Sequence, residues 1–203
     1  MAELPRTLVV VALRAESAGV FEAAGIPVLY CGVGKVNAAI ALGRELARYL
    51  RQGQDLPLVL NFGSAGSRQH ATGTLVECHE FVQRDMDVSG LGFALGVTPY
   101  DEAPPCLRFE RIFNHLPPAV CGSGDSFATA PSGIDCGVVD MEAYALAKVC
   151  WLEAAAFACV KYVSDGADTR AAADWQNNVH RAASEFLDLY RKVSGFPGGT
   201  RIP

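Results

Sequence analysis

The chain alternates short, continuously apolar segments with longer segments of helical spacing, and this alternation limits the folds open to it. Residues 7–13 are apolar and β-branched without a break, which is typical of a strand buried on both faces. Residues 36–52 are rich in alanine and leucine and place apolar side chains at helical spacing. Because strands that alternate with helices form a sheet covered on both faces, we expect an α/β protein with a mainly parallel sheet.

The same reasoning divides the whole chain into elements. The predicted strands are residues 7–13, 26–34, 56–67, 73–88, 118–127 and 154–165. The predicted helices are residues 14–25 closed by Gly25, 36–52, 108–116, 141–153, and 175–193 with Asp174 as its cap. We expect a loop over residues 90–105 and a frayed tail over residues 195–203. With no repeat or linker, the 203 residues are predicted to form one domain, 1–203.

Composition excludes several classes of function. The net charge is −5 and no cluster of lysine and arginine is present, so we expect no nucleic-acid partner. No apolar run reaches the ~20 residues that cross a bilayer, and no signal peptide is visible, so we expect a cytoplasmic protein without a membrane partner. The seven cysteines form no CxxC pair and the four histidines form no ligand pattern with them, which predicts buried thiols and no metal site.

Polar and glycine-rich residues follow the predicted strands. In a wound α/β sheet the active site lies at the carboxyl ends of the strands, so these residues are expected to converge there. They are Glu16, residues 32–34, 61–66 and 122–127, and the pair Ser164 and Asp165.

Two of these residues are carboxylic acids from opposite ends of the chain. Glu16 follows the first predicted strand, and Asp165 ends the last one. Such a pair suits cleavage of a glycosidic bond, in which one acid protonates the leaving group and the other activates water. The alternatives are that Glu16 is a solvated acid in the first turn of a helix and that Asp165 caps a helix or turn.

Three loops allow a functional and a structural interpretation. The sequence GVGK, residues 32–35, lacks the spacing of a phosphate-binding loop and is better explained as a tight turn. The sequence GSAG, residues 63–66, offers backbone N–H groups at a strand end, as a ribose or anion site would. Phe127 in GSGDSF is either a ring that stacks on a base or a core phenylalanine.

Seven blocks of sequence together resemble the purine nucleoside phosphorylase superfamily, and within it the methylthioadenosine/S-adenosylhomocysteine nucleosidases. The blocks are VVVALRAES, YCGVGKVNAAIA, VLNFGSAGS, RDMDVSGLGF, CGSGDSF, VVDMEAYALAKVC and VKYVSDGAD, in the family's order and over most of the chain. VVDMEAYALA and VSDGAD are the most specific. The resemblance implies a three-layer α/β/α sandwich with a mixed, mainly parallel sheet, a homodimer, and no metal or organic cofactor.

The resemblance also implies roles for single residues. Glu16 matches the acid that deprotonates the attacking water, and Asp165 matches the acid that protonates N7 of the leaving purine, supported by Ser164. The implied contacts to the substrate are Ser64 beside the water and ribose, Met141 and Glu142 on the ribose, Phe127 stacked on the base, Ala128 at the base edge, and Val88, Leu91 and Phe93 around the 5′ substituent. Glu142 is expected to be ionised so that it accepts two hydroxyl groups.

Water, rather than phosphate, is the predicted nucleophile. A phosphorylase needs arginines around the attacking position, and the place of one such arginine before the glycine-serine loop is taken by the neutral Asn61. Arg14 is the opposing detail, because phosphorylases carry an arginine nearby; it could also pair with Glu16, bind an anionic 5′ group or face solvent. A phosphorylase and a non-catalytic nucleoside-binding relative are therefore the alternatives.

The sequence departs from the family over residues 96–120, which are shorter by most of a helix. This region normally helps to shape the pocket for the 5′ group and reaches toward the dimer partner. The 5′ group is accordingly open between methylthio, homocysteinyl and the substituent of a futalosine-type substrate. The charged run over residues 83–87 also allows a phosphorylated or otherwise polar substrate.

Overall fold

A computed structural model describes residues 6–131 and 133–194, which form eight strands and six α-helices. The strands are β1 (Thr7–Val11), β2 (Val28–Tyr30), β3 (Leu58–Gly66), β4 (Leu75–Gln83), β5 (Cys106–Arg108), β6 (Pro118–Ser123), β7 (Val138–Asp140) and β8 (Phe157–Asp165). The helices are α1 (Arg14–Ser17), α2 (Val20–Ala23), α3 (Lys35–Arg51), α4 (Ala143–Glu153), α5 (Ala171–Asn178) and α6 (Ala183–Val193), with a 3₁₀ turn, η1 (Ser89–Leu91).

All eight strands belong to one mixed sheet in the order β2-β1-β3-β7-β6-β4-β5, with β8 paired to both β3 and β4. The pairs β1–β2, β1–β3, β3–β8, β4–β6 and β6–β7 are parallel. The pairs β3–β7, β4–β5 and β4–β8 are antiparallel. Since β3 contacts β7 on one side and β8 on the other, these strands curl toward one another and bring their ends to one place.

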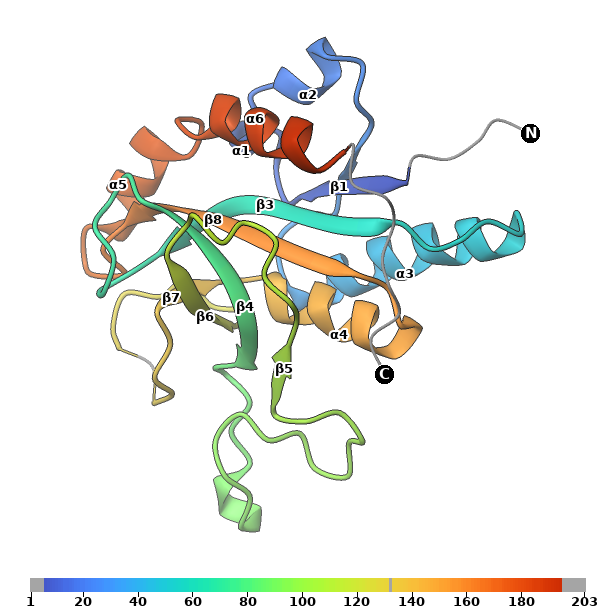
Figure 1. Cartoon of the computed structure of the whole chain (residues 1–203). Helices are drawn as coiled ribbons and strands as arrows, with labels where there is room; N and C mark the ends of the chain where they lie inside the picture. The colour runs from blue at the N-terminus through green and yellow to red at the C-terminus, as the bar shows by residue number, and fades with distance from the viewer. Residues whose placement is uncertain (1–5, 132, 195–203) are drawn as a thin grey trace.

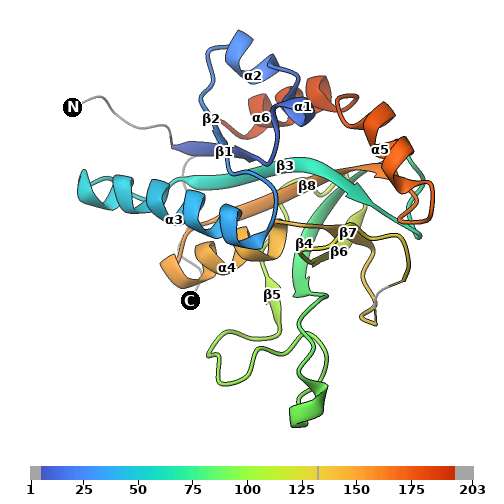
Figure 2. The same ribbon diagram turned by 180° about the vertical axis from the view of Figure 1, so that it is seen from behind.

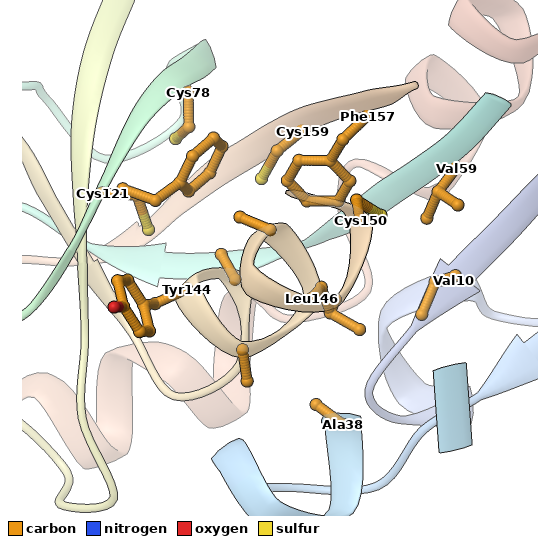
Figure 3. Close-up of a cluster of buried hydrophobic side chains, with 14 of the residues drawn as sticks. Val10, Ala38, Val59, Cys78, Cys121, Tyr144, Leu146, Cys150, Phe157 and Cys159 are labelled. Atoms are coloured by element: carbon orange, nitrogen blue, oxygen red, sulfur yellow. The ribbon is translucent and has the colours of Figure 1, made fainter. Parts of the chain in front are cut away.

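Helices cover both faces of the sheet, as expected for three layers (Figures 1 and 2). Helices α3 and α4 lie on one face, and α1, α2 and α6 lie on the other. Each face has its own buried apolar cluster, one with residues of α3 and α4 and the other with residues of α2 and α6. Figure 3 shows part of the first cluster, where Leu146 and Cys150 of α4 lie among strand residues such as Val59 and Phe157.

The two clearest patterns in the sequence are confirmed. All nine residues of β8 are buried, because strands flank it on both sides and helices cover the sheet. Helix α3 buries residues four and three apart, namely Ala38, Leu42, Leu46 and Tyr49. Five cysteines are buried, and no disulfide joins any of the seven.

The helix predicted over residues 108–116 is wrong. Its start belongs to β5, which pairs antiparallel with β4. The backbone N–H groups of Ile112 and Phe113 donate to one oxygen of the buried Glu77, at 2.7 and 2.8 Å. A carboxylate distant in sequence thus takes the donors that a helix would need.

Two other helices are divided, and two strands, β5 and β7, are missing from the prediction. Residues 14–25 form α1 and α2, which are separated where Ala18 and Gly19 adopt left-handed φ values of 47° and 73°. The last predicted helix is α5 and α6, and Asp174 lies inside α5 rather than capping it. Strand β7 was not predicted at all, and the tail predicted at 195–203 lies outside the described residues. None of the described helices is both long and apolar enough to cross a membrane.

Candidate active site

An open cavity of about 760 Å³, mouth included, lies at the carboxyl ends of β1, β3, β6, β7 and β8. Eight of the eleven residues predicted to form a site line it: Glu16, Ser64, Phe127, Ala128, Met141, Glu142, Ser164 and Asp165. Its wall also includes Asp140, Arg84 and Trp175, which the sequence did not identify as site residues.

Glu16 is held by three hydrogen bonds at the base of the cavity. Its Oε1 accepts from both the backbone N–H and the hydroxyl of Ser64, each at 2.8 Å, and its Oε2 accepts from the Leu13 N–H at 3.0 Å. Only 5% of the residue is exposed, so the alternative of a solvated acid in a helix turn is wrong. The carboxylate keeps one orientation, since both of its oxygens are engaged.

Asp165 lies at the end of β8 and is 3% exposed. Its Oδ2 accepts from the Ser164 hydroxyl at 2.8 Å, and its Oδ1 accepts from the Ala167 N–H at 2.9 Å. The second bond is that of a turn cap, so Asp165 both stabilises the turn and faces the cavity. A Cβ at Gly66 would lie 2.6 Å from Asp165 Oδ1, which explains why this strand end requires glycine.

The GSAG sequence, residues 63–66, is the last part of β3 and not the loop that was predicted. It makes room for charged groups instead of binding an anion through its backbone. The Ser64 N–H donates to Glu16, and a Cβ at Gly63 would lie 3.1 Å from Glu16 Oε1 and 3.2 Å from Lys161 Nζ. Small residues here therefore let the side chains of Glu16 and Lys161 approach the strand from two directions.

Glu142 precedes α4 and accepts a hydrogen bond from the Gly34 N–H at 2.9 Å. Burial, together with the negative charge of Asp140, raises the pKa of Glu142 to about 7. The carboxyl group is thus close to half protonated at neutral pH, whereas the sequence led us to expect it ionised. The GVGK segment leads into α3 through Gly32 and Gly34, which have positive φ values of 79° and 94°. The next N–H, that of Lys35, donates to Asp125 at 2.7 Å.

A buried ion pair lies behind the cavity. Lys161 Nζ is 2.9 Å from Asp140 Oδ2, and both side chains are almost fully buried. Asp140 also accepts from the Ser123 hydroxyl at 2.5 Å and the Ala143 N–H at 2.9 Å. Burial opposes both charges, but the attraction of Lys161 keeps the pKa of Asp140 below its usual value, and the attraction of Asp140 raises that of Lys161. A lysine inside the otherwise apolar β8 was the signal that could have revealed this pair.

The charged run over residues 83–87 holds the loop that leads to Phe127. Asp85 bonds Lys35 Nζ at 2.5 Å and the Asp125 N–H at 2.8 Å. The Arg84 guanidinium donates to the carbonyl oxygens of Gly124 and Ser126. These contacts fix the loop over residues 124–126, so Lys35, Arg84 and Asp85 have structural partners before any substrate enters.

The three residues predicted around the 5′ substituent, Val88, Leu91 and Phe93, do not line the cavity of their own chain. They belong to the segment between β4 and β5, which projects from the body of the molecule around η1 (Figure 1). In this segment the ring of Phe93 packs edge-on against Tyr100 at 5.8 Å between centroids.

The structure also shows the surroundings of Arg14 and Asn61, the two residues relevant to phosphate binding. The Arg14 side chain is 77% exposed, pairs with Glu22 at 3.0 Å and stacks over the Tyr30 ring at 4.4 Å. It therefore adds no charge to the cavity. Asn61 is buried and donates to the Val10 carbonyl at 3.1 Å. Among the described residues, Arg84 is the one cation of the cavity wall, against the four acids Glu16, Asp140, Glu142 and Asp165.

A curled α/β sheet with a carboxylate-lined cavity at its strand ends matches one family of enzymes. The chain belongs to the phosphorylase superfamily, whose family model matches residues 18–194. It is similar to the 5′-methylthioadenosine/S-adenosylhomocysteine nucleosidase of Anoxybacillus flavithermus, with 28% identity over 91% of this chain and 86% of the relative. The nucleosidase of the same name from Bacillus subtilis is also 28% identical, over 86% of this chain and 83% of its own length.

Solved structures share the fold. The Helicobacter pylori 5′-methylthioadenosine/S-adenosylhomocysteine nucleosidase superposes with a TM-score of 0.79 and 22% identity, over 94% of this chain and 99% of that one. A futalosine hydrolase mutant from Helicobacter pylori gives the same TM-score at 21% identity, over 94% and 100% of the two chains. These neighbours confirm the nucleoside phosphorylase-like fold.

Proposed function

We propose that this protein is a purine nucleosidase that hydrolyses the N-glycosidic bond of 5′-methylthioadenosine and S-adenosylhomocysteine. The products are the free base and the corresponding ribose derivative. The observation that carries the proposal is the gathering of three buried carboxyl groups, those of Glu16, Glu142 and Asp165, around one cavity at the strand ends. The names of the similar proteins agree with this chemistry.

The two catalytic acids have different tasks. Glu16 accepts a proton from water, which attacks the anomeric carbon as the glycosidic bond breaks through an oxocarbenium-like state. Asp165 donates a proton to N7 of the purine, so that the base leaves as a neutral molecule. The three hydrogen bonds to Glu16 hold its carboxylate in place for the water, and Ser164 orients Asp165.

The other lining residues bind the nucleoside. Glu142 accepts the 2′ and 3′ hydroxyl groups beside Met141, while Phe127 stacks on the base and the Ala128 backbone meets the base edge. Phe127 is 47% exposed, so it is not a core residue, which supports the stacking role predicted for it. The described residues contain no cluster of three or more possible metal ligands.

Water is favoured over phosphate as the nucleophile by the charge of the cavity. Because Lys161 already neutralises Asp140, a phosphate anion would meet the other three acids of the wall and one arginine, and that arginine already binds the loop before Phe127. Arg14, whose presence in the sequence was the argument for a phosphorylase, pairs with Glu22 instead of reaching the cavity. The three acids also favour an enzyme over a non-catalytic binding relative.

A futalosine-type nucleosidase is the second candidate. It is favoured by the futalosine hydrolase among the structural neighbours and by the short region 96–120, which leaves the 5′ end of the substrate less enclosed. The same acids would act in the same roles, and only the 5′ substituent would differ.

We also propose a cytoplasmic homodimer. The projecting segment carries Leu91, which is 76% exposed, and α3 presents Val36 and Ile40 at 67% and 48% exposure. Val88 and Phe93 would then complete the 5′ end of the cavity in the second copy, which accounts for their distance from the cavity of their own chain.

The test is incubation of the purified protein with 5′-methylthioadenosine, S-adenosylhomocysteine, adenosine, inosine and futalosine, each with and without phosphate. Free base is followed by chromatography. Base release without phosphate, with free ribose sugar as the second product, is the expected result. Release only with phosphate would assign a phosphorylase, and no release from any nucleoside would contradict the proposal.

A further inference from the structure

We infer that Trp175 is a positioning residue for the reaction: its indole N–H fixes the Ser64 hydroxyl as a donor to Glu16. The inference rests on the proposed function, because it assigns Glu16 to the activation of water. Trp175 is on α5, 111 residues along the chain from Ser64, and it lines the cavity. Two hydrogen bonds connect the three side chains: the indole Nε1 donates to Ser64 Oγ at 2.9 Å, and Ser64 Oγ donates to Glu16 Oε1 at 2.8 Å.

The direction of these two hydrogen bonds follows from the number of protons that each group carries. An indole N–H can only donate, so the Ser64 oxygen must accept from Trp175. The serine hydroxyl carries one proton, and its remaining partner is the Glu16 carboxylate. With the indole in place, the hydroxyl therefore donates to Glu16 and not to the substrate or to the attacking water.

This orientation matters for the water. Glu16 Oε1 receives two donors from Ser64, and Oε2 receives one from the Leu13 N–H. An ionised carboxylate offers about four acceptor positions, which leaves one on Oε2 for the proton of the water. If the Ser64 hydroxyl were free to rotate, it would compete for the water and the carboxylate would lose its alignment. A small error of alignment at this point is costly to the reaction rate.

A second contact holds helix α5 in the position from which the Trp175 indole reaches Ser64. Asn178, at the end of α5, donates through Nδ2 to the Ser164 carbonyl at 2.9 Å, next to Asp165. The helix thus touches the neighbourhood of both catalytic acids, through Trp175 on the Glu16 side and Asn178 on the Asp165 side. Phenylalanine at position 175 would preserve most of the ring packing and remove only the N–H donor.

The kinetic test is a double-mutant cycle of Trp175→Phe and Ser64→Ala on the full chain, with 5′-methylthioadenosine as substrate. We expect Trp175→Phe to lower kcat by about three- to tenfold, equivalent to one net hydrogen bond, with KM nearly unchanged. In the Ser64→Ala background, Trp175→Phe should have no further effect, because the group through which it acts is gone. Trp151→Phe, on the exposed side of α4, is the matched control and should retain wild-type kinetics.

Two results overturn the inference: a Trp175→Phe enzyme with wild-type kcat, or an equal loss in both backgrounds, which would indicate a merely structural role. A second measurement does not depend on activity. The sequence has two tryptophans, so in Trp151→Phe the indole N–H signal in NMR belongs to Trp175. Its exchange with solvent should be slow and should become faster with Ser64→Ala. A wild-type protein that releases no base overturns the proposed function, whereas unchanged exchange overturns the hydrogen-bond chain alone.

Discussion

At the scale of the residue, the proposed reaction depends on which of the acids carries a proton. Asp165→Asn keeps the size and one acceptor of the side chain but removes the group that we propose as the proton donor for N7. We expect kcat to fall by about 10²- to 10⁴-fold, in the range of general acid catalysis. Base release and thermal unfolding measure activity and fold separately. Asp188→Asn, which alters an exposed pair with Arg191 on α6, should change neither.

Glu142 makes the binding of substrate dependent on pH. Its pKa of about 7 in the folded protein means that the carboxylate, which we propose accepts the ribose hydroxyls, disappears as the pH falls below 7. KM should therefore rise by up to about tenfold per pH unit below 7 and level off above it. A Glu142→Gln enzyme should have a high KM that no longer varies in this way. A flat KM between pH 5.5 and 8.5 in the wild type would contradict the role of Glu142.

The same group affects the stability of the free protein in a direction opposite to that of a typical surface acid. Because the folded state raises the pKa of Glu142 above the ordinary 4.5, the folded state binds the proton more tightly than the unfolded state. This contribution to the free energy of unfolding is present below pH 4.5 and is lost as the pH rises to about 7. Glu142→Gln should remove that part of the pH dependence in urea denaturation, and an unchanged profile would contradict it.

The residues that sequence reasoning missed are those whose partners lie far along the chain. Glu16 and Asp165 could be identified because each follows an apolar strand and belongs to a specific sequence block. Trp175 resembles any apolar residue of a helix, and its role depends on a contact with Ser64. Lys161 is unusual in a buried strand, yet only the structure shows that Asp140 neutralises it.

At the scale of the element, patterns within one segment were reliable and patterns that depend on other segments were not. The strands β1, β3 and β8 and the helix α3 follow from continuous or helical apolar spacing. Residues 108–116 failed because Glu77 of β4 takes their N–H groups. Strand β7 has only three residues and pairs mainly with β6, so no local signal marks it.

The loop before Phe127 offers a test of how elements position the base. Asp85 joins this loop to α3 through Asp125 and Lys35, and Lys35 helps to hold the pKa of Asp85 below its usual value although burial opposes it. Asp85→Ala should free the loop and raise KM several-fold, with a smaller effect on kcat, because the stacking ring is less well ordered. Asp87→Ala, a change at an exposed neighbour, is the control. Equal kinetics for the two variants would show that the loop needs no such support.

At the scale of the whole molecule, the cavity is open and part of the predicted pocket lies outside it. Val88 and Phe93 are on the projecting segment between β4 and β5, and the same segment carries the exposed Leu91. A second copy would bury this apolar surface and supply the residues that the cavity lacks. The dimer would thus be part of the active site, and its loss would affect substrate binding as well as size.

Replacing Leu91 by aspartate tests this arrangement, because a charge at an apolar interface is costly to bury. We expect the wild type to sediment as a dimer and Leu91→Asp to shift toward the monomer, with a rise in KM that is larger for nucleosides with a bulky 5′ group than for adenosine. Leu152→Asp, at an apolar side chain that is 62% exposed on α4, is the control for charge alone. A monomeric wild type with full activity would show that one chain suffices, and the 5′ group would then extend into solvent through the open side of the cavity.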